Sequence, residues 1–240
     1  MLACCLLMAA CNASSDAASG GDAPHRPLPA ISATLSWERL DGGSNRVREA
    51  YATYIDSCRQ AGFPTRELAP DEVDKLGHGQ VDIRIDDRHQ HVRQTRWEFE
   101  QDSASAGPAG CAARLVAHQD EADGSTDPAD GMFLPTEATP PEHDEGGWRY
   151  LGTGQVRGQA CKRWQKQDQE VCIWSGGTEW GFGDGPLDVA GCAVDSAGSY
   201  FSAIPLEGNP LAGNGCKLML QAFTIGKGPL PPEPAKPRGN

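Results

Sequence analysis

Six of the nine cysteines, those that remain when Cys4, Cys5 and Cys11 of the apolar N-terminal run are set aside, point most directly to chemistry by their number and spacing. The number is even, and in an oxidising compartment six thiols can form three disulfides, although spacing alone does not choose among the pairings. None has the close paired spacing of a zinc site, so no structural metal is predicted. The six residues are Cys58, Cys111, Cys161, Cys172, Cys192 and Cys216.

One pairing follows from local geometry. Residues 159–174 have the pattern of a hairpin that turns midway. In the register we expect, Cys161 lies opposite Cys172 and Arg163 opposite Glu170, which places the thiols at disulfide distance and the opposite charges face to face. Closing so short a loop stabilises the fold by about 2–3 kcal/mol. The alternative is two unpaired, buried thiols.

Residues that could catalyse hydrolysis or bind a transition metal are present without the pattern that such sites need. Ser175, before two glycines, is the nearest match to a nucleophile, but no Gly-x-Ser-x-Gly segment occurs and a turn serine is the simpler interpretation. His89 and His91 could act as metal ligands together with His78, but they flank a charged turn where solvent exposure is expected. The sequence therefore predicts no catalytic site, no metal and no cofactor.

Residues 119–147 are the most acidic stretch, with nine Asp or Glu side chains and no Lys or Arg. Their carboxylates could bind calcium, but the spacing does not match an EF-hand loop. Because the stretch is also rich in Gly and Pro, we expect a solvated loop that could bind an envelope protein. The formal charge of the chain is -12, which argues against nucleic acid and anionic lipid surfaces as partners.

The N-terminus is an apolar run that ends in two alanines before Cys11 and becomes polar from Asn12 onward. It is shorter than the roughly 20 residues of a membrane-spanning helix and is typical of an export signal. It resembles a bacterial lipoprotein signal, although Met8 stands where Leu is usual and no Lys or Arg precedes the run. That resemblance implies a signal peptide over residues 1–10 and an acyl (palmitate-type) anchor on Cys11. A cleaved ordinary signal and a buried strand are the alternatives.

In signals of this kind an Asp after the lipidated cysteine marks retention in the inner membrane. Asn12 occupies that position here. The resemblance therefore implies an outer-membrane lipoprotein that faces the periplasm.

Hydrophobic periodicity predicts the elements that must position these residues. Helical spacing predicts a main helix and a short second one, over residues 44–62 and 70–76. Alternation predicts antiparallel strands in the cysteine hairpin and over residues 81–85, 95–99, 111–117, 148–156 and 217–225. The fold class is therefore α+β, with one main N-terminal helix and disulfides.

Composition divides the rest of the chain. Residues 11–32 are poor in apolar side chains and are interpreted as a flexible tether, and residues 226–240 as a Pro-rich disordered tail. Residues 33–225 are expected to form a single disulfide-stabilised domain.

Four tryptophans lie around the cysteine hairpin: Trp148, Trp164, Trp174 and Trp180. Side chains of this size are usually covered on at least one side. They could fill the core beneath the sheet, or they could line a concave surface that accepts an apolar ligand.

Residues 150–161, from Tyr150 to Cys161, resemble a strand-turn-strand phrase of the LolA/LolB-like lipoprotein-carrier superfamily, and residues 220–227 are similar to its last strand. The resemblance covers about a third of the chain. It implies a strongly curved, half-barrel-like antiparallel sheet around helical segments, with an apolar concavity that holds lipid or acyl chains in some members. The predicted disulfides and the acidic stretch depart from this pattern.

These observations favour a non-catalytic envelope lipoprotein that binds a lipidic or other apolar ligand. The first alternative is a structural or interaction module that holds an envelope protein through residues 119–147. The second is an uncharacterised hydrolase, which would need a pocket that joins His89 or His91 to an acid or a serine.

Overall fold

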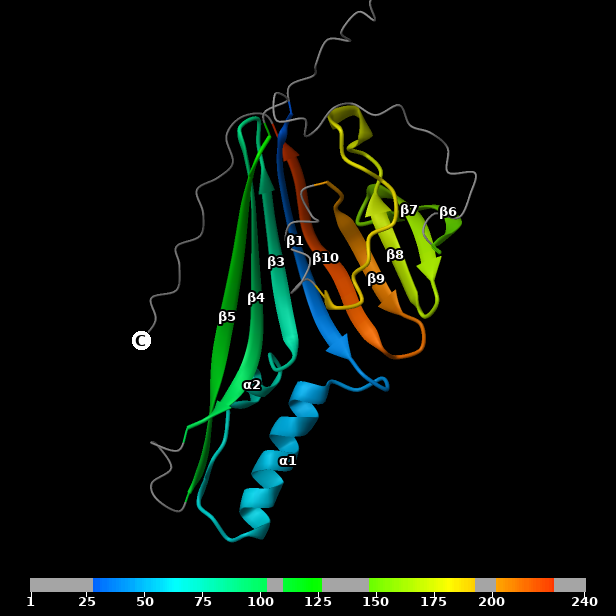
Figure 1. The fold of residues 1–240 in the computed structure, drawn as a ribbon. Coiled ribbons are helices and arrows are strands. Elements are labelled where there is room, and N and C mark those ends of the chain that lie inside the picture. Colours follow the sequence, from blue (N-terminus) through cyan, green and yellow to red (C-terminus); the bar gives the residue numbers. More distant parts are fainter. Residues whose placement is uncertain (1–27, 103–109, 127–146, 193–201, 227–240) are drawn as a thin grey trace, which may run out of the picture.

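The computed structural model describes residues 28–102, 110–126, 147–192 and 202–226. In this part of the chain ten strands form one sheet in the order β2-β5-β4-β3-β1-β10-β9-β8-β7-β6, and only the β2–β5 pair is parallel (Figure 1). The elements are β1 Ala30–Leu40, α1 Arg46–Gln60, β2 Thr65–Arg66, α2 Pro70–Val73, β3 His78–Ile85, β4 His89–Gln101, β5 Cys111–Ser125, β6 Arg149–Val156, β7 Gln159–Lys166, β8 Gln169–Trp174, a 3-10 turn Thr178–Trp180, β9 Pro205–Pro210 and β10 Gly215–Gly226.

The first strand, β1, lies in the middle of the sheet between β3 and β10. Its alternate residues Ile31, Ala33, Leu35 and Trp37 are buried, because they face the core while the residues between them are only half-buried. The sequence analysis missed this strand. β1 begins at Ala30, inside the range 11–32 that was predicted to be a tether, and residues 1–27 lie outside the described part.

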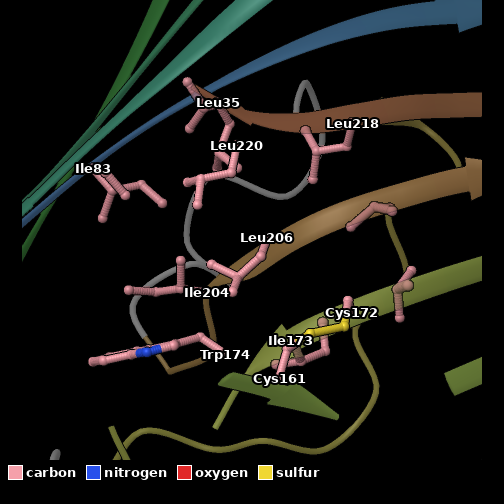
Figure 2. Packing of buried hydrophobic residues seen from close by; sticks show 14 of the residues in the cluster. Leu35, Ile83, Cys161, Cys172, Ile173, Trp174, Ile204, Leu206, Leu218 and Leu220 are labelled. Atoms are coloured by element: carbon pink, nitrogen blue, oxygen red, sulfur yellow. A yellow bond between two sulfur atoms is a disulfide. The ribbon is translucent and has the colours of Figure 1, made fainter. Parts of the chain in front are cut away.

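The chain between β8 and β9, and not a helix, covers the main apolar core. From this segment Val189 and Ile204 are fully buried and belong to one cluster with apolar side chains of β1, β3 and β10. Figure 2 shows Leu35 and Leu220 on one side of this core, with Ile204 and Trp174 on the other. The main core therefore lies between the sheet and the described parts of the segment that joins β8 to β9.

The predicted main helix is present as α1 and forms a second, smaller core. Asn45 caps its N-terminus by accepting a hydrogen bond from the Arg48 backbone N–H at 3.1 Å. The buried face of α1 packs at the far end of β4, where the Phe99 ring lies 5.5 Å from that of Tyr51 and 6.0 Å from that of Tyr54. This contact fixes α1 beside the start of β5.

The expectation of a strongly curved, half-barrel-like antiparallel sheet is wrong. The sheet is mixed, it is open at both ends, and it twists without curling into a barrel (Figure 1). The motifs behind that expectation encode a strand, a bulge and a tight turn, which open and curved sheets share. The long β1–β10 pairing and the covering segment, which those motifs do not specify, set the actual shape.

Three disulfides are present: Cys58–Cys111, Cys161–Cys172 and Cys192–Cys216. The second is the pair predicted from the hairpin, but the predicted register is wrong by two residues. Cys161 lies opposite Trp174, and Cys172 lies opposite Arg163. A shift of two residues leaves every side chain on its own face, so the thiols still meet as diagonal neighbours.

The close packing of Gly79 on Trp37 yields a stability prediction. The two residues are cross-strand partners, and a β-carbon added to Gly79 would lie 2.5 Å from Nε1 of the buried Trp37 side chain. Gly79→Ala should therefore lower the free energy of unfolding by about 1–3 kcal/mol, measured by urea denaturation. Gly226→Ala is the matched control, because nothing lies within 4 Å of its added β-carbon. Equal effects of the two changes would contradict the packing described.

Candidate functional site

One edge of the sheet is open along most of β5. β5 pairs with β4 from Ala113 to Ser125, and β2 covers only Cys111 and Ala112 on its other side. From Ala113 to Asp123 this other side has no strand beside it in the described part of the chain. An edge of this length presents a row of backbone N–H and C=O groups on which an extended segment can pair.

The hydrogen bonds at both ends of β5 show which backbone groups point outward. Ala112 accepts from Asp102 N at 2.8 Å, and Thr126 N donates to Arg88 O, so the even-numbered residues face β4. Cys111 N donates to Pro64 O on the opposite side. The odd-numbered residues from Ala113 to Asp123 therefore direct their backbone groups to the open edge.

Three carboxylate side chains lie along the open edge, near the C-terminal end of β5. Asp120, Glu121 and Asp123 have side chains that are 57%, 41% and 81% exposed. Each faces a basic residue of β4 across the ladder, at 3.8 Å, 3.9 Å and 2.7 Å respectively. These cross-strand pairs hold β5 in register and leave the carboxylates accessible to a further cation.

The start of β5 is fixed to the rest of the molecule. The Cys58–Cys111 disulfide joins it to α1, and the Tyr54 hydroxyl donates to the Ala112 carbonyl at 3.2 Å. A binding edge that belongs to a rigid sheet loses little conformational entropy when a partner strand adds to it.

The acidic stretch 119–147 begins as a strand and not as the loop that the sequence predicted. Residues 119–125 belong to β5, while residues 127–146 lie outside the described part. The missed signal is the complementary charge on β4, where His91, Arg93 and Arg96 face the acids of β5. That signal becomes visible only when the pairing of the two strands is known.

The four tryptophans lie in or against the core. Trp164 and Trp174 are each 1% exposed, Trp148 is buried, and Trp180 packs on the cluster from its edge. The Trp174 ring lies 6.3 Å from Trp180 and 5.0 Å from Phe223. Of the two roles that the sequence left open, these side chains take the packing role in the structure.

The structure contains a cavity of about 550 Å³ at the N-terminus of α1, and none of the tryptophans lines it. Its wall includes Glu38, Glu49, Arg48 and Lys217, so acidic and basic groups balance. Asn45 already caps the helix and also donates to the carbonyl of Leu76 at 2.8 Å. Nothing in this wall selects a charged or an apolar ligand.

The candidate catalytic residues do not form a site. His91 Nδ1 lies 2.7 Å from Asp123, and His89 is exposed at the β3–β4 turn. His78 lies at the opposite end of β3, where it pairs with Glu38. Ser175 follows β8 and donates its backbone N–H to the carbonyl of Ala160. Among the described residues no group of three His, Cys, Asp or Glu side chains is placed to bind a metal ion.

A cluster of charges lies on the other half of the sheet. The Arg163 guanidinium is 2.8 Å from Glu170 and 3.1 Å from Glu207. Burial acts to lower the pKa of Arg163, but the hydrogen bonds and charges of the two glutamates outweigh it and raise that pKa above its usual value. The cluster ties β7, β8 and β9 together and leaves no unpaired charge for catalysis.

Cys11, the predicted anchor, lies outside the described residues, so anchoring remains a prediction. None of the helices that the structure describes has the length and apolar character to cross a bilayer. No protein-family model matches the chain, and no curated protein matches it.

The direction of the β5 backbone groups can be tested with proline, which has no N–H to donate. Asp120→Pro removes a donor that faces β4 and should lower the free energy of unfolding by about 3 kcal/mol or more. Gln119→Pro removes only an outward donor, and its effect should be below about 1 kcal/mol. Urea denaturation of both variants, with Asp120→Ala as the control for the lost charge, measures the difference. A larger loss at Gln119 would reverse the assignment.

Proposed function

We propose that this protein is a non-catalytic, lipid-anchored module of the bacterial envelope that binds an extended segment of a partner protein on the open edge of β5. Cys11 carries the anchor on the periplasmic face of the outer membrane, and the residues before Ala30 act as the tether. The observation that carries the proposal is the edge from Ala113 to Asp123, beside which no strand lies among the residues that the structure describes. Strand addition at such an edge is a common mode of peptide recognition.

The charges and apolar groups of β5 define the kind of segment that fits. Leu115 and Ala117 share one face of the strand with Glu121 and Asp123, because side chains two residues apart lie on the same face. An added strand therefore fits best with apolar residues at one end and Lys or Arg at alternate positions of the other. Each well-placed cross-strand pair of side chains contributes about 0.2–1 kcal/mol to the free energy of strand pairing.

Other functions lack a comparable observation. A lipidic ligand is not proposed, because the tryptophans that would line its site are packed in the core. Hydrolysis is not proposed, because the pairing of His91 with Asp123 is by itself no catalytic site.

Binding of a designed peptide tests the proposal. The probe is a fluorescein-labelled peptide of about 10 residues in which lysine alternates with valine or threonine, a length typical of a strand. Fluorescence anisotropy with the full chain should show saturable binding, and Gln119→Pro should weaken it about tenfold or more through the lost hydrogen bond and the bulk of the ring.

The control separates strand pairing from simple charge attraction. The same peptide carrying N-methyl groups at alternate residues keeps its charge but cannot complete the ladder. Equal binding of the two peptides, or no effect of Gln119→Pro, would remove the basis for the proposal.

Fractionation tests the anchor. Cys11→Ala should move the protein from the membrane fraction to the soluble periplasmic fraction, whereas Cys5→Ala, within the predicted signal, should leave it membrane-bound. Asn12→Asp should shift it from outer-membrane to inner-membrane fractions on a sucrose gradient. A Cys11→Ala protein that stays with the membrane would contradict the lipoprotein assignment.

A further inference from the structure

Among the described strands the sheet has a second open edge, β6, at the end opposite to β5 (Figure 1). β6 pairs with β7 across the two-residue turn Arg157-Gly158, whose residues both have positive φ. In such a hairpin the flanking residues, Val156 and Gln159, bond to each other. The alternate residues Thr153 and Gln155 therefore direct their backbone N–H groups away from β7, toward open space.

The two edges carry opposite charge. β5 has exposed carboxylates at Asp120, Glu121 and Asp123, whereas β6 and its turn carry the exposed Arg149 and Arg157 and no acid. The segregation is visible in the sequence too, because residues 147–166 hold five Lys or Arg and no Asp or Glu. The C-terminal end of the β5 edge is thus acidic, while Arg114 nearer its start is paired with Glu100, and the β6 edge is basic.

We infer that copies of this chain associate head to tail, with β6 of one copy added to the β5 edge of the next. This inference rests on the proposed function, since it names the strand that the β5 edge takes. Pairing two β5 edges over their acidic ends, or two β6 edges over their basic ends, would bring like charges together and is disfavoured. A contact between two different surfaces leaves both surfaces available at the ends of the assembly, so it extends into a row or ring.

A bulge limits the strength of each contact. The β6 register shifts between Tyr150 and Gly152, and Leu151 at the bulge is 42% exposed. Only Gly152–Val156 run regularly, so the added ladder is short and the association is concentration-dependent. Tethering to one membrane surface raises the local concentration and favours such a contact.

Two single-substitution variants, each with one edge blocked, and an equimolar mixture of the two test the arrangement. Gln119→Pro blocks the β5 edge and Gln155→Pro blocks the β6 edge, each at an outward N–H. Sedimentation velocity of the Cys11→Ala full chain should show mass rising beyond the dimer with concentration at low salt, and falling as salt screens the charges. Each blocked variant alone should be monomeric. Their equimolar mixture should form a dimer and nothing larger, because only one productive edge pair remains.

The outcomes distinguish this inference from the function on which it rests. A wild-type protein that stays monomeric at every concentration while the lysine peptide still binds at β5 overturns the self-association and leaves the proposed function standing. A wild-type protein that neither associates with itself nor binds the peptide overturns both the self-association and the proposed function. Association of the Gln155→Pro variant with itself would indicate β5–β5 pairing and overturn the head-to-tail arrangement, and a mixture that stays monomeric would do the same.

Discussion

The structure depends on covering one apolar face of a wide sheet, and no helix of the described residues lies across that face. α1 reaches only the end of β4 and the start of β5, so the segment between β8 and β9 supplies the apolar cover. Trp174 shows the result, because its ring contacts Phe182 from that segment and Phe223 from β10. The Cys192–Cys216 disulfide fastens the same segment to β10.

Much of the fold could be predicted from hydrophobic alternation, and what was missed has physical reasons. α1, β3 and β10 bury one clear face each, and their patterns predicted them. β1 alternates just as clearly, from Ile31 to Trp37, but it adjoins an Ala-, Ser- and Pro-rich stretch whose composition suggested a tether. The register error of two residues in the cysteine hairpin kept both faces correct, which is why the disulfide was still found.

The binding edge could not be read from the sequence in the same way. The end of β5 carries polar groups on both faces, so it has no buried face to reveal it, and its acids predicted a loop. Whether a strand lies at an edge also depends on pairings between distant segments. Here the antiparallel contact of β1 with β10 joins two groups of strands and leaves β5 and β6 at opposite ends.

The central position of β1 also affects how the chain folds. Its Ala30 pairs with Gly226, so the first strand of the described chain is completed only by the last one. Contacts between segments this distant in sequence form slowly, because closing the long loop between them costs chain entropy before any pairing hydrogen bond can form. β3 follows soon after β1 in the chain and pairs with it from Ile31 to Glu38, so only the other side of β1 stays open until β10 is made. β1 therefore takes its place in two steps, first against β3 and later against β10.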